Sequence, residues 1–286
     1  MARQNSFVRW AGGKSWFIPF FEKITKNLNY KNYFEPFAGG ASIFFSCVRG
    51  HNAYLSDLNG ELINAYAMVK EYPEELCKQL ESMKVSEEKY YFYRDKYVCD
   101  SNIKKAARFL YLNHASFNGI YRVNKNGMYN VPYGKRNIQY NTDLIKRANL
   151  SLMNTELKTG DFAIWTDFIS KDDLVFLDPP YSVSSEKKEN GFIAYNQKLF
   201  SLEDQKRLQE FIIQIKNKKA YYILTNVVND KIFEIFEECG DICVTLSRAC
   251  VIGGKNAKRE KVKEYVFTNI PQSNWGVEDG YFESIN

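Results

Sequence analysis

Residues 33–42 read YFEPFAGGAS, and this stretch decides the fold. Its first five residues are apolar enough for a buried strand, the glycines Gly39 and Gly40 mark a turn, and residues 41–48 have the pattern of a helix. A second short strand is predicted at residues 53–56 and ends at Asp57. The order strand, glycine turn, helix, strand and acid is typical of a nucleotide-binding α/β sheet.

The same strand pattern returns later in the chain. Residues 174–177 and 220–224 are near-continuous apolar runs, which predict buried strands. Between them Ser201 is a candidate N-cap that opens a long amphipathic helix. Residues 241–246 and 262–268 are predicted to close the sheet as an antiparallel pair.

The middle of the chain differs from both flanks. Residues 61–150 are mostly helix-patterned, rich in tyrosine and charge, and lack apolar runs of the buried-strand type. We therefore expect one catalytic α/β domain formed by residues 1–60 and 151–286, with an inserted subdomain at residues 61–150.

Composition excludes several classes of protein. The chain has 286 residues, 45% of them hydrophobic, which is enough for a core and rules out general disorder. No apolar run approaches the roughly 20 residues that span a bilayer, and the first residues lack a signal-peptide pattern. The six cysteines are scattered without zinc-knuckle spacing and there are only two histidines, so we expect reduced thiols and no metal site.

The net charge of +5 is modest, but its distribution is uneven. Residues 101–150 hold nine Lys/Arg against the single acid Asp143, and residues 248–263 hold six against Glu260. A solvated surface is the ordinary explanation of one such run. Two runs on one chain favour a face that binds a polyanion.

The string DPPY at residues 178–181 directly follows the predicted strand 174–177, where α/β sheets bind ligands. Its two prolines stiffen the backbone and lack N–H donors, so their carbonyls serve as acceptors. Asp178 adds a carboxylate acceptor and Tyr181 an aromatic face, a set that suits a planar exocyclic amino group. A rigid strand-ending turn is the alternative, but such a turn does not require the aspartate and the tyrosine together.

These motifs resemble the DNA adenine methylase family, whose members methylate the N6 amino group of adenine with S-adenosylmethionine. DPPY is similar to the family's catalytic signature, and the order of motifs is that of its alpha group. The match runs nearly end to end and rests on RWAGGK at 9–14, FEPFAGGAS at 34–42, SDLN at 56–59, LYLN at 110–113, FNGIYR at 117–122 and NVPYG at 130–134. The resemblance implies a Rossmann-like methyltransferase sheet with an inserted, mainly helical target-recognition subdomain.

The resemblance also implies roles for single residues. Trp10 and Lys14 are expected at the methionine end of the cofactor S-adenosyl-L-methionine, since a lysine can pair with its carboxylate. Asp57 is expected to bind the ribose hydroxyls, next to a turn whose glycines let the backbone approach closely. Asp161 is expected at the cofactor's adenine, with a helix cap as its alternative role. The implied cofactor set is Trp10, Lys14, Phe37, Gly39, Gly40, Asp57, Asp161, Phe162 and Asp178.

The implied catalytic set is Asp178, Pro179, Pro180 and Tyr181. Hydrogen bonds from adenine N6 to the Asp178 carboxylate and the Pro179 carbonyl would offset the positive charge that develops during methyl transfer. The base must leave the duplex, with Tyr181 stacking against it. Phe192 and Tyr195 either line the same pocket or pack in the core. Neither a metal nor a covalent cysteine is required.

The recognition segment yields a hypothesis about the DNA sequence. Arginine reads guanine by a bidentate contact, which is the role expected of Arg122, with a surface salt bridge as the alternative. Asn118 is expected at a base edge, and Ile120 at a thymine methyl or as a wedge. Because the segment resembles that of GATC methylases, we hypothesise a short palindrome containing GATC. The residues expected to contact phosphates are Lys125, Lys135, Arg136, Lys255, Lys258 and Arg259.

Two rival functions stay open at this point: an N4-cytosine methyltransferase, whose amine the same acceptors suit, and a DNA-binding relative without activity. Asp178 favours adenine over cytosine. The expected partner is double-stranded DNA in a prokaryotic or phage-infected cytoplasm, with no membrane and no obligate protein partner. The sequence leaves open whether a cognate restriction endonuclease acts on the same site.

Overall fold

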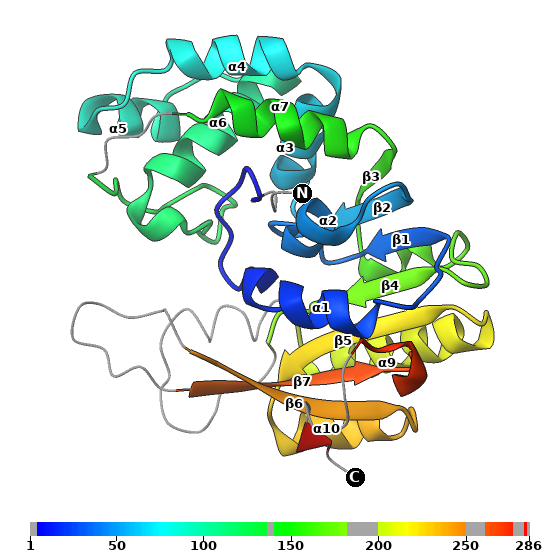
Figure 1. Cartoon of the computed structure of the whole chain (residues 1–286). Helices are drawn as coiled ribbons and strands as arrows, with labels where there is room; N and C mark the ends of the chain where they lie inside the picture. The colour runs from blue at the N-terminus through cyan, green and yellow to red at the C-terminus, as the bar shows by residue number, and fades with distance from the viewer. Residues whose placement is uncertain (1–4, 136–139, 182–199, 250–260, 277–282, 285–286) are drawn as a thin grey trace. The chain divides into compact units, whose positions relative to one another are not determined.

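The structure is a computed structural model that describes residues 5–135, 140–181, 200–249, 261–276 and 283–284. Two compact units make up the chain (Figure 1). Unit 1 comprises Met1–Ile18 and Ala38–Phe162, and unit 2 comprises Pro19–Phe37 and Ala163–Asn286. The boundaries expected for an inserted subdomain stay a prediction.

Unit 1 contains a parallel pair of strands, β2 (Asn52–Asp57) and β3 (Thr155–Thr159), with Asp57 opposite Thr159. The expected strand at residues 53–56 is confirmed as β2. Strand β3 is not anticipated by the sequence, because of its five side chains only that of Thr155 is buried and no apolar run marks it. Helix α2 (Ser42–Cys47) follows the glycine turn, as expected.

The helices of the middle segment gather in unit 1, as Figure 1 shows. Helix α6 buries most of its length and packs against α3, α4 and α5, while α7 packs against α3 and α4. Their bounds are α3 (Gly60–Glu71), α4 (Pro73–Ser82), α5 (Glu87–Asp95), α6 (Asn102–Ala115) and α7 (Thr142–Leu152). The mainly helical character expected of this region is confirmed, except that residues 116–135 contain only the short η2 (Phe117–Gly119) and isolated bridges.

Unit 2 contains the remaining strands, and its order is β1-β4-β5-β7-β6-β8. The first three strands of this order are parallel, and the last three follow as antiparallel neighbours. The closing antiparallel pair expected near the end of the chain is therefore confirmed. The strand bounds are β1 (Asn32–Glu35), β4 (Leu174–Leu177), β5 (Tyr221–Val227), β6 (Ile242–Ala249), β7 (Lys261–Thr268) and β8 (Glu283–Ser284).

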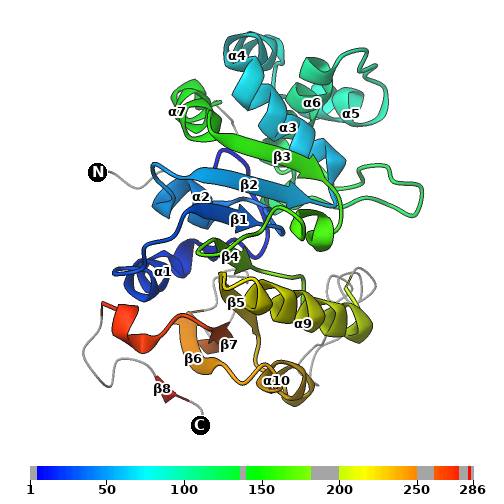
Figure 2. The same ribbon diagram turned by 90° about the vertical axis from the view of Figure 1, so that its right-hand side faces the viewer.

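Helices α9 (Leu202–Asn217) and α10 (Asp230–Glu237) pack on each other, and α9 lies along β5 (Figure 2). The predicted N-cap at Ser201 is confirmed as a full capping box. The Ser201 hydroxyl accepts the Asp204 N–H at 3.1 Å, and the Asp204 carboxylate accepts the Ser201 N–H at 2.9 Å. Helix α1 (Ile18–Ile24) and the short η1 (Lys14–Trp16), η3 (Phe162–Trp165) and η4 (Gln272–Asn274) complete the element order.

The expected fold class is confirmed: the chain is an α/β protein with Rossmann-like parallel strands and an antiparallel closing pair. Within the described ranges, none of the helices has the length and apolar character needed to cross a membrane. Cys77, Cys239 and Cys243 are buried free thiols, whereas Cys47 and Cys99 are half-buried. Burial raises the pKa of Cys239 to about 11 and that of Cys243 to about 12, so both stay protonated at neutral pH.

Candidate functional site

The glycine turn of unit 1 is held from several sides. Gly39 adopts a left-handed φ of 45°, which glycine tolerates because it has no Cβ. Its N–H donates to the Asp57 carboxylate at 3.0 Å, and its carbonyl accepts the Tyr66 hydroxyl at 2.7 Å. The Ala38 N–H donates to the Ser56 carbonyl at 2.9 Å, which ties the turn to strand β2. The turn is therefore anchored to both β2 and α3.

The Asp57 carboxylate organises this end of β2. Its second oxygen accepts the Asn59 N–H at 2.9 Å, and the Asp57 carbonyl accepts the Gly160 N–H at 3.1 Å. Burial raises the pKa of Asp57, and the two N–H donors from Asn59 and Gly39 oppose that rise. Each carboxylate oxygen has a further lone pair, so the group can still accept a ligand hydroxyl.

Four further residues of the expected cofactor set, Trp10, Lys14, Asp161 and Phe162, also lie in unit 1. The Trp10 indole packs directly on the glycine turn, since a Cβ built on Gly39 would lie 2.7 Å from its Cδ1. The Lys14 side chain is only 4% exposed, so its ammonium is largely removed from water. Asp161 directly precedes η3, where Phe162 is buried. The structure thus brings Trp10, Gly39 and Asp57 together.

The DPPY string lies in unit 2, at the carboxyl end of β4. Parallel pairing of β4 with β5 sets Leu177 opposite Leu224, so the next residues of the two strands are neighbours. The Thr225 hydroxyl donates to the Asp178 carboxylate at 3.1 Å and lies 3.5 Å from the Leu177 carbonyl. Thr225 is fully buried, and no sequence signal singles it out.

The remaining predicted catalytic residues of unit 2 differ in burial. Pro179 is buried, while Asp178, Pro180 and Tyr181 are half-buried. Phe37, which the sequence places with the cofactor residues, falls in unit 2, where its ring meets that of Phe200 edge-on at 5.6 Å. Phe192 and Tyr195 lie outside the described residues.

The expected DNA-reading residues occupy the irregular stretch after α6. Asn118 is exposed and left-handed, with φ 57°, and Ile120 is half-buried. Arg122 is exposed, and its Nε donates to the Asn130 side-chain oxygen at 2.8 Å. A bridge between Val123 and Tyr129 brings Arg122 and Asn130 face to face. Hydrogen bonding to Asn130, and not a salt bridge, is therefore the contact that orients Arg122 among the described residues.

Asn130 leaves the end of the Arg122 guanidinium unobstructed. Its Nη2 donates weakly to the Asn130 carbonyl at 3.4 Å, so of the five N–H groups of an arginine three have no acceptor among the described residues. That arrangement presents the terminal fork that bidentate contacts use. Lys125 and Lys135 are exposed, whereas Arg136, Lys255, Lys258 and Arg259 lie outside the described residues.

The chain is similar to known proteins over most of its length. A family described as D12 class N6 adenine-specific DNA methyltransferase matches residues 10–247. Type II methyltransferase M1.LlaDCHI of Lactococcus lactis subsp. cremoris is 32% identical over 274 residues, covering 92% of this chain and 94% of that protein. Type II methyltransferase M.MjaIII of Methanocaldococcus jannaschii is 31% identical, covering 91% and 96%. DNA adenine methylase of Salmonella typhi is 29% identical, covering 79% and 82%.

Proposed function

Because the chain belongs to the D12 class of N6 adenine-specific DNA methyltransferases, we propose that its methyl donor is S-adenosyl-L-methionine and that its target adenine lies in a short palindrome such as GATC. The observation that carries methyl transfer to an amine is the anchored carboxylate of Asp178, which directly follows strand β4 and accepts a hydrogen bond from the buried Thr225. A carboxylate held in this way is oriented to accept hydrogen bonds from an amino group.

The residues of unit 1 fit this donor. Lys14 offers a largely buried cation for its carboxylate, and Asp57 offers acceptor lone pairs for its ribose hydroxyls. The turn at Gly39 has no room for a Cβ because the Trp10 indole packs against it, which keeps Trp10, an expected donor contact, next to the turn. When bound, S-adenosylmethionine supplies a methyl group already activated on a sulfonium.

The residues of unit 2 fit the acceptor amine. The lone pair of adenine N6 is delocalised into the ring and is a poor nucleophile. We propose that the Asp178 carboxylate and the Pro179 carbonyl accept hydrogen bonds from the two N6 hydrogens. This arrangement favours a pyramidal nitrogen and offsets its developing positive charge. Thr225 holds the Asp178 carboxylate in place, and Tyr181 supplies an aromatic face for the flipped base.

Arg122 is assigned to a guanine of the recognition sequence. Asn130 orients its guanidinium, and the three remaining N–H groups suit the O6 and N7 acceptors of guanine. Phe117, in η2 five residues before Arg122, is 53% exposed, which suits stacking on a base more than packing in a core. Asn118 keeps its expected role at a base edge, and Ile120 keeps its role at a thymine methyl or as a wedge. Lys125 and Lys135 keep their expected roles at phosphates.

Sequencing that maps modified bases tests the proposal. The chain is expressed in a host without adenine methylation, and its DNA is compared with DNA from a host that expresses Asp178→Ala. We expect N6-methyladenine in GATC for the wild type and none for the variant. A different mapped sequence would refute GATC alone, whereas unmodified DNA from the wild type would favour the inactive DNA-binding relative. A restriction endonuclease with the same recognition sequence is the protein partner that this proposal allows.

A further inference from the structure

Glu61 connects the acid turn of unit 1, residues 57–59, to the segments around it. It is the second residue of α3, and Asn59 caps that helix by accepting the N–H groups of Glu61 at 3.1 Å and Leu62 at 3.2 Å. The Asn59 N–H in turn donates to the Asp57 carboxylate at 2.9 Å. The backbone of Glu61 is therefore set by the same turn that we assign to the methyl donor.

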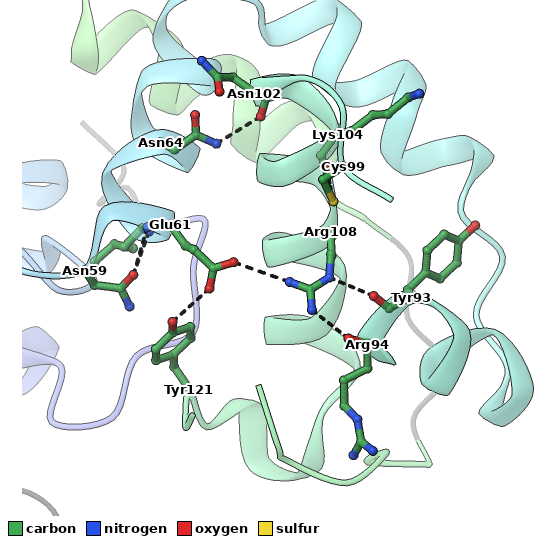
Figure 3. A network of polar contacts seen from close by, with 11 residues as sticks. Asn59, Glu61, Asn64, Tyr93, Arg94, Cys99, Asn102, Lys104, Arg108 and Tyr121 are labelled. Carbon is green, nitrogen blue, oxygen red and sulfur yellow. Dashed lines mark hydrogen bonds and ion pairs between the residues drawn. The ribbon is translucent and has the colours of Figure 1, made fainter. Parts of the chain in front are cut away.

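The Glu61 carboxylate has two partners from other parts of the chain (Figure 3). One oxygen lies 3.4 Å from Nη1 of Arg108 on α6, and the other accepts the Tyr121 hydroxyl at 2.9 Å. The Arg108 guanidinium is itself fixed, because it donates to the carbonyls of Tyr93 and Arg94 at 2.8 Å each. Because the Arg108 cation holds one oxygen of the Glu61 carboxylate, the other oxygen is directed toward Tyr121.

Tyr121 stacks on Trp10, which is assigned to the methyl donor, and directly precedes Arg122, which is assigned to guanine. The two stacked rings have centroids 5.7 Å apart and 22° between the planes, and Trp10 covers Gly39. Asn113 of α6 fixes the backbone beside Trp10, since it accepts the Arg9 N–H at 2.8 Å and donates to the Arg9 carbonyl at 2.7 Å.

Stability alone does not account for this arrangement. The Glu61 side chain is 42% exposed and that of Arg108 is 18% exposed, and an ion pair open to water contributes little to the free energy of folding. What the contacts supply is a defined position for the Tyr121 ring. Displacing Trp10 or the acid turn would change that position, and with it the backbone at Arg122.

We propose that Glu61 is a positioning residue that, through Tyr121, couples occupancy of the methyl-donor site to binding of the recognition sequence. This inference rests on the proposed function of Trp10, Asp57 and Arg122. Because coupling between two binding sites is reciprocal, donor binding tightens DNA binding by the same factor as DNA tightens donor binding. Such factors are typically about 5- to 150-fold.

The test measures DNA affinity of the full chain with and without sinefungin, a donor analogue that carries no transferable methyl group. Fluorescence anisotropy of a labelled duplex that bears the mapped sequence gives both dissociation constants, and their ratio is the coupling factor. We expect at least about a fivefold factor for the wild type. Tyr121→Phe, which keeps the ring and removes the hydroxyl, should reduce the coupling factor to less than about twofold. Glu61→Gln should retain most of it, because a side-chain amide can still hydrogen-bond the Tyr121 hydroxyl, which both donates and accepts.

Asn64→Ala is the matched control. The Asn64 amide donates to the Asn102 carbonyl at 3.0 Å, so it also joins α3 to α6, but it does not touch Tyr121 (Figure 3). This variant should keep the wild-type factor. The inference is overturned if the wild type shows no coupling, if Tyr121→Phe keeps it, or if Asn64→Ala loses it equally. N6-methyladenine formed by the same wild-type preparation separates these outcomes from failure of the proposed function, in which no adenine is methylated.

Discussion

Replacing Gly39 by alanine is expected to damage both stability and donor binding. Two separate costs apply at this position. The left-handed φ of 45° is unfavourable for an L-residue by about 1–2 kcal/mol. The added Cβ would also lie 2.7 Å from Cδ1 and 2.8 Å from Nε1 of Trp10, closer than atoms of these types pack.

The second cost is not relieved by a simple side-chain rotation. Trp10 is stacked on Tyr121, so its indole cannot move away without losing that contact. Overpacking of this kind costs about 1–3 kcal/mol. Together with the backbone strain, Gly39→Ala should lower the free energy of unfolding by about 2–5 kcal/mol. Displacement of Trp10 should weaken binding of sinefungin as well.

Gly50→Ala provides the matched control. Gly50 has φ 73°, also left-handed, but a Cβ there would meet nothing within 4 Å. Its cost should be the strain alone, about 1–2 kcal/mol, with donor binding unchanged. Urea unfolding followed by circular dichroism measures the first quantity, and titration calorimetry the second. If Gly39→Ala costs no more than Gly50→Ala, the reasoning about the contact with Trp10 is refuted.

Two other perturbations test separate contacts. Thr225→Val removes the hydroxyl that donates to Asp178, a bond to a charged group worth about 1.5–3 kcal/mol, so kcat should fall about 10- to 100-fold while Thr225→Ser restores it. Equal kcat for both variants would contradict that role in positioning. Burial lowers the pKa of His114 below 6.5, so its contribution to stability is present above pH 6.5 and is lost as the pH falls through the folded-state pKa. Urea midpoints between pH 7.5 and 5.5 should therefore drop more for the wild type than for His114→Gln, and parallel curves would count against this assignment.

Two of the strands that the sequence predicted share one property. Residues 174–177 and 220–224 are continuous apolar runs because strands β4 and β5 are buried, and burial selects apolar side chains. Strand β3 is not predicted by an apolar run, because its residues are mostly polar and partly exposed. Its pairing with β2 comes from backbone hydrogen bonds, which every residue except proline can both donate and accept.

The chemistry of the target amine was also predictable to a useful degree. DPPY and the glycine turn pointed to an amino methyltransferase, and the family match confirms an adenine-specific enzyme over the N4-cytosine alternative. Partners of those residues were not predictable. Thr225 reaches Asp178 only because β4 and β5 pair in parallel with Leu177 opposite Leu224. Asn130 reaches Arg122 only through the bridge that joins Val123 to Tyr129.

The sequence by itself determined the fold class, the reaction class and most of the candidate residues, because each of these is written in local patterns of a few neighbouring residues. Only the tertiary structure decided which groups hold those residues in place. Glu61 and Tyr121 are sixty residues apart in the chain, yet their side chains meet at 2.9 Å. Contacts of this kind depend on the packing of whole helices and strands, so no local pattern encodes them.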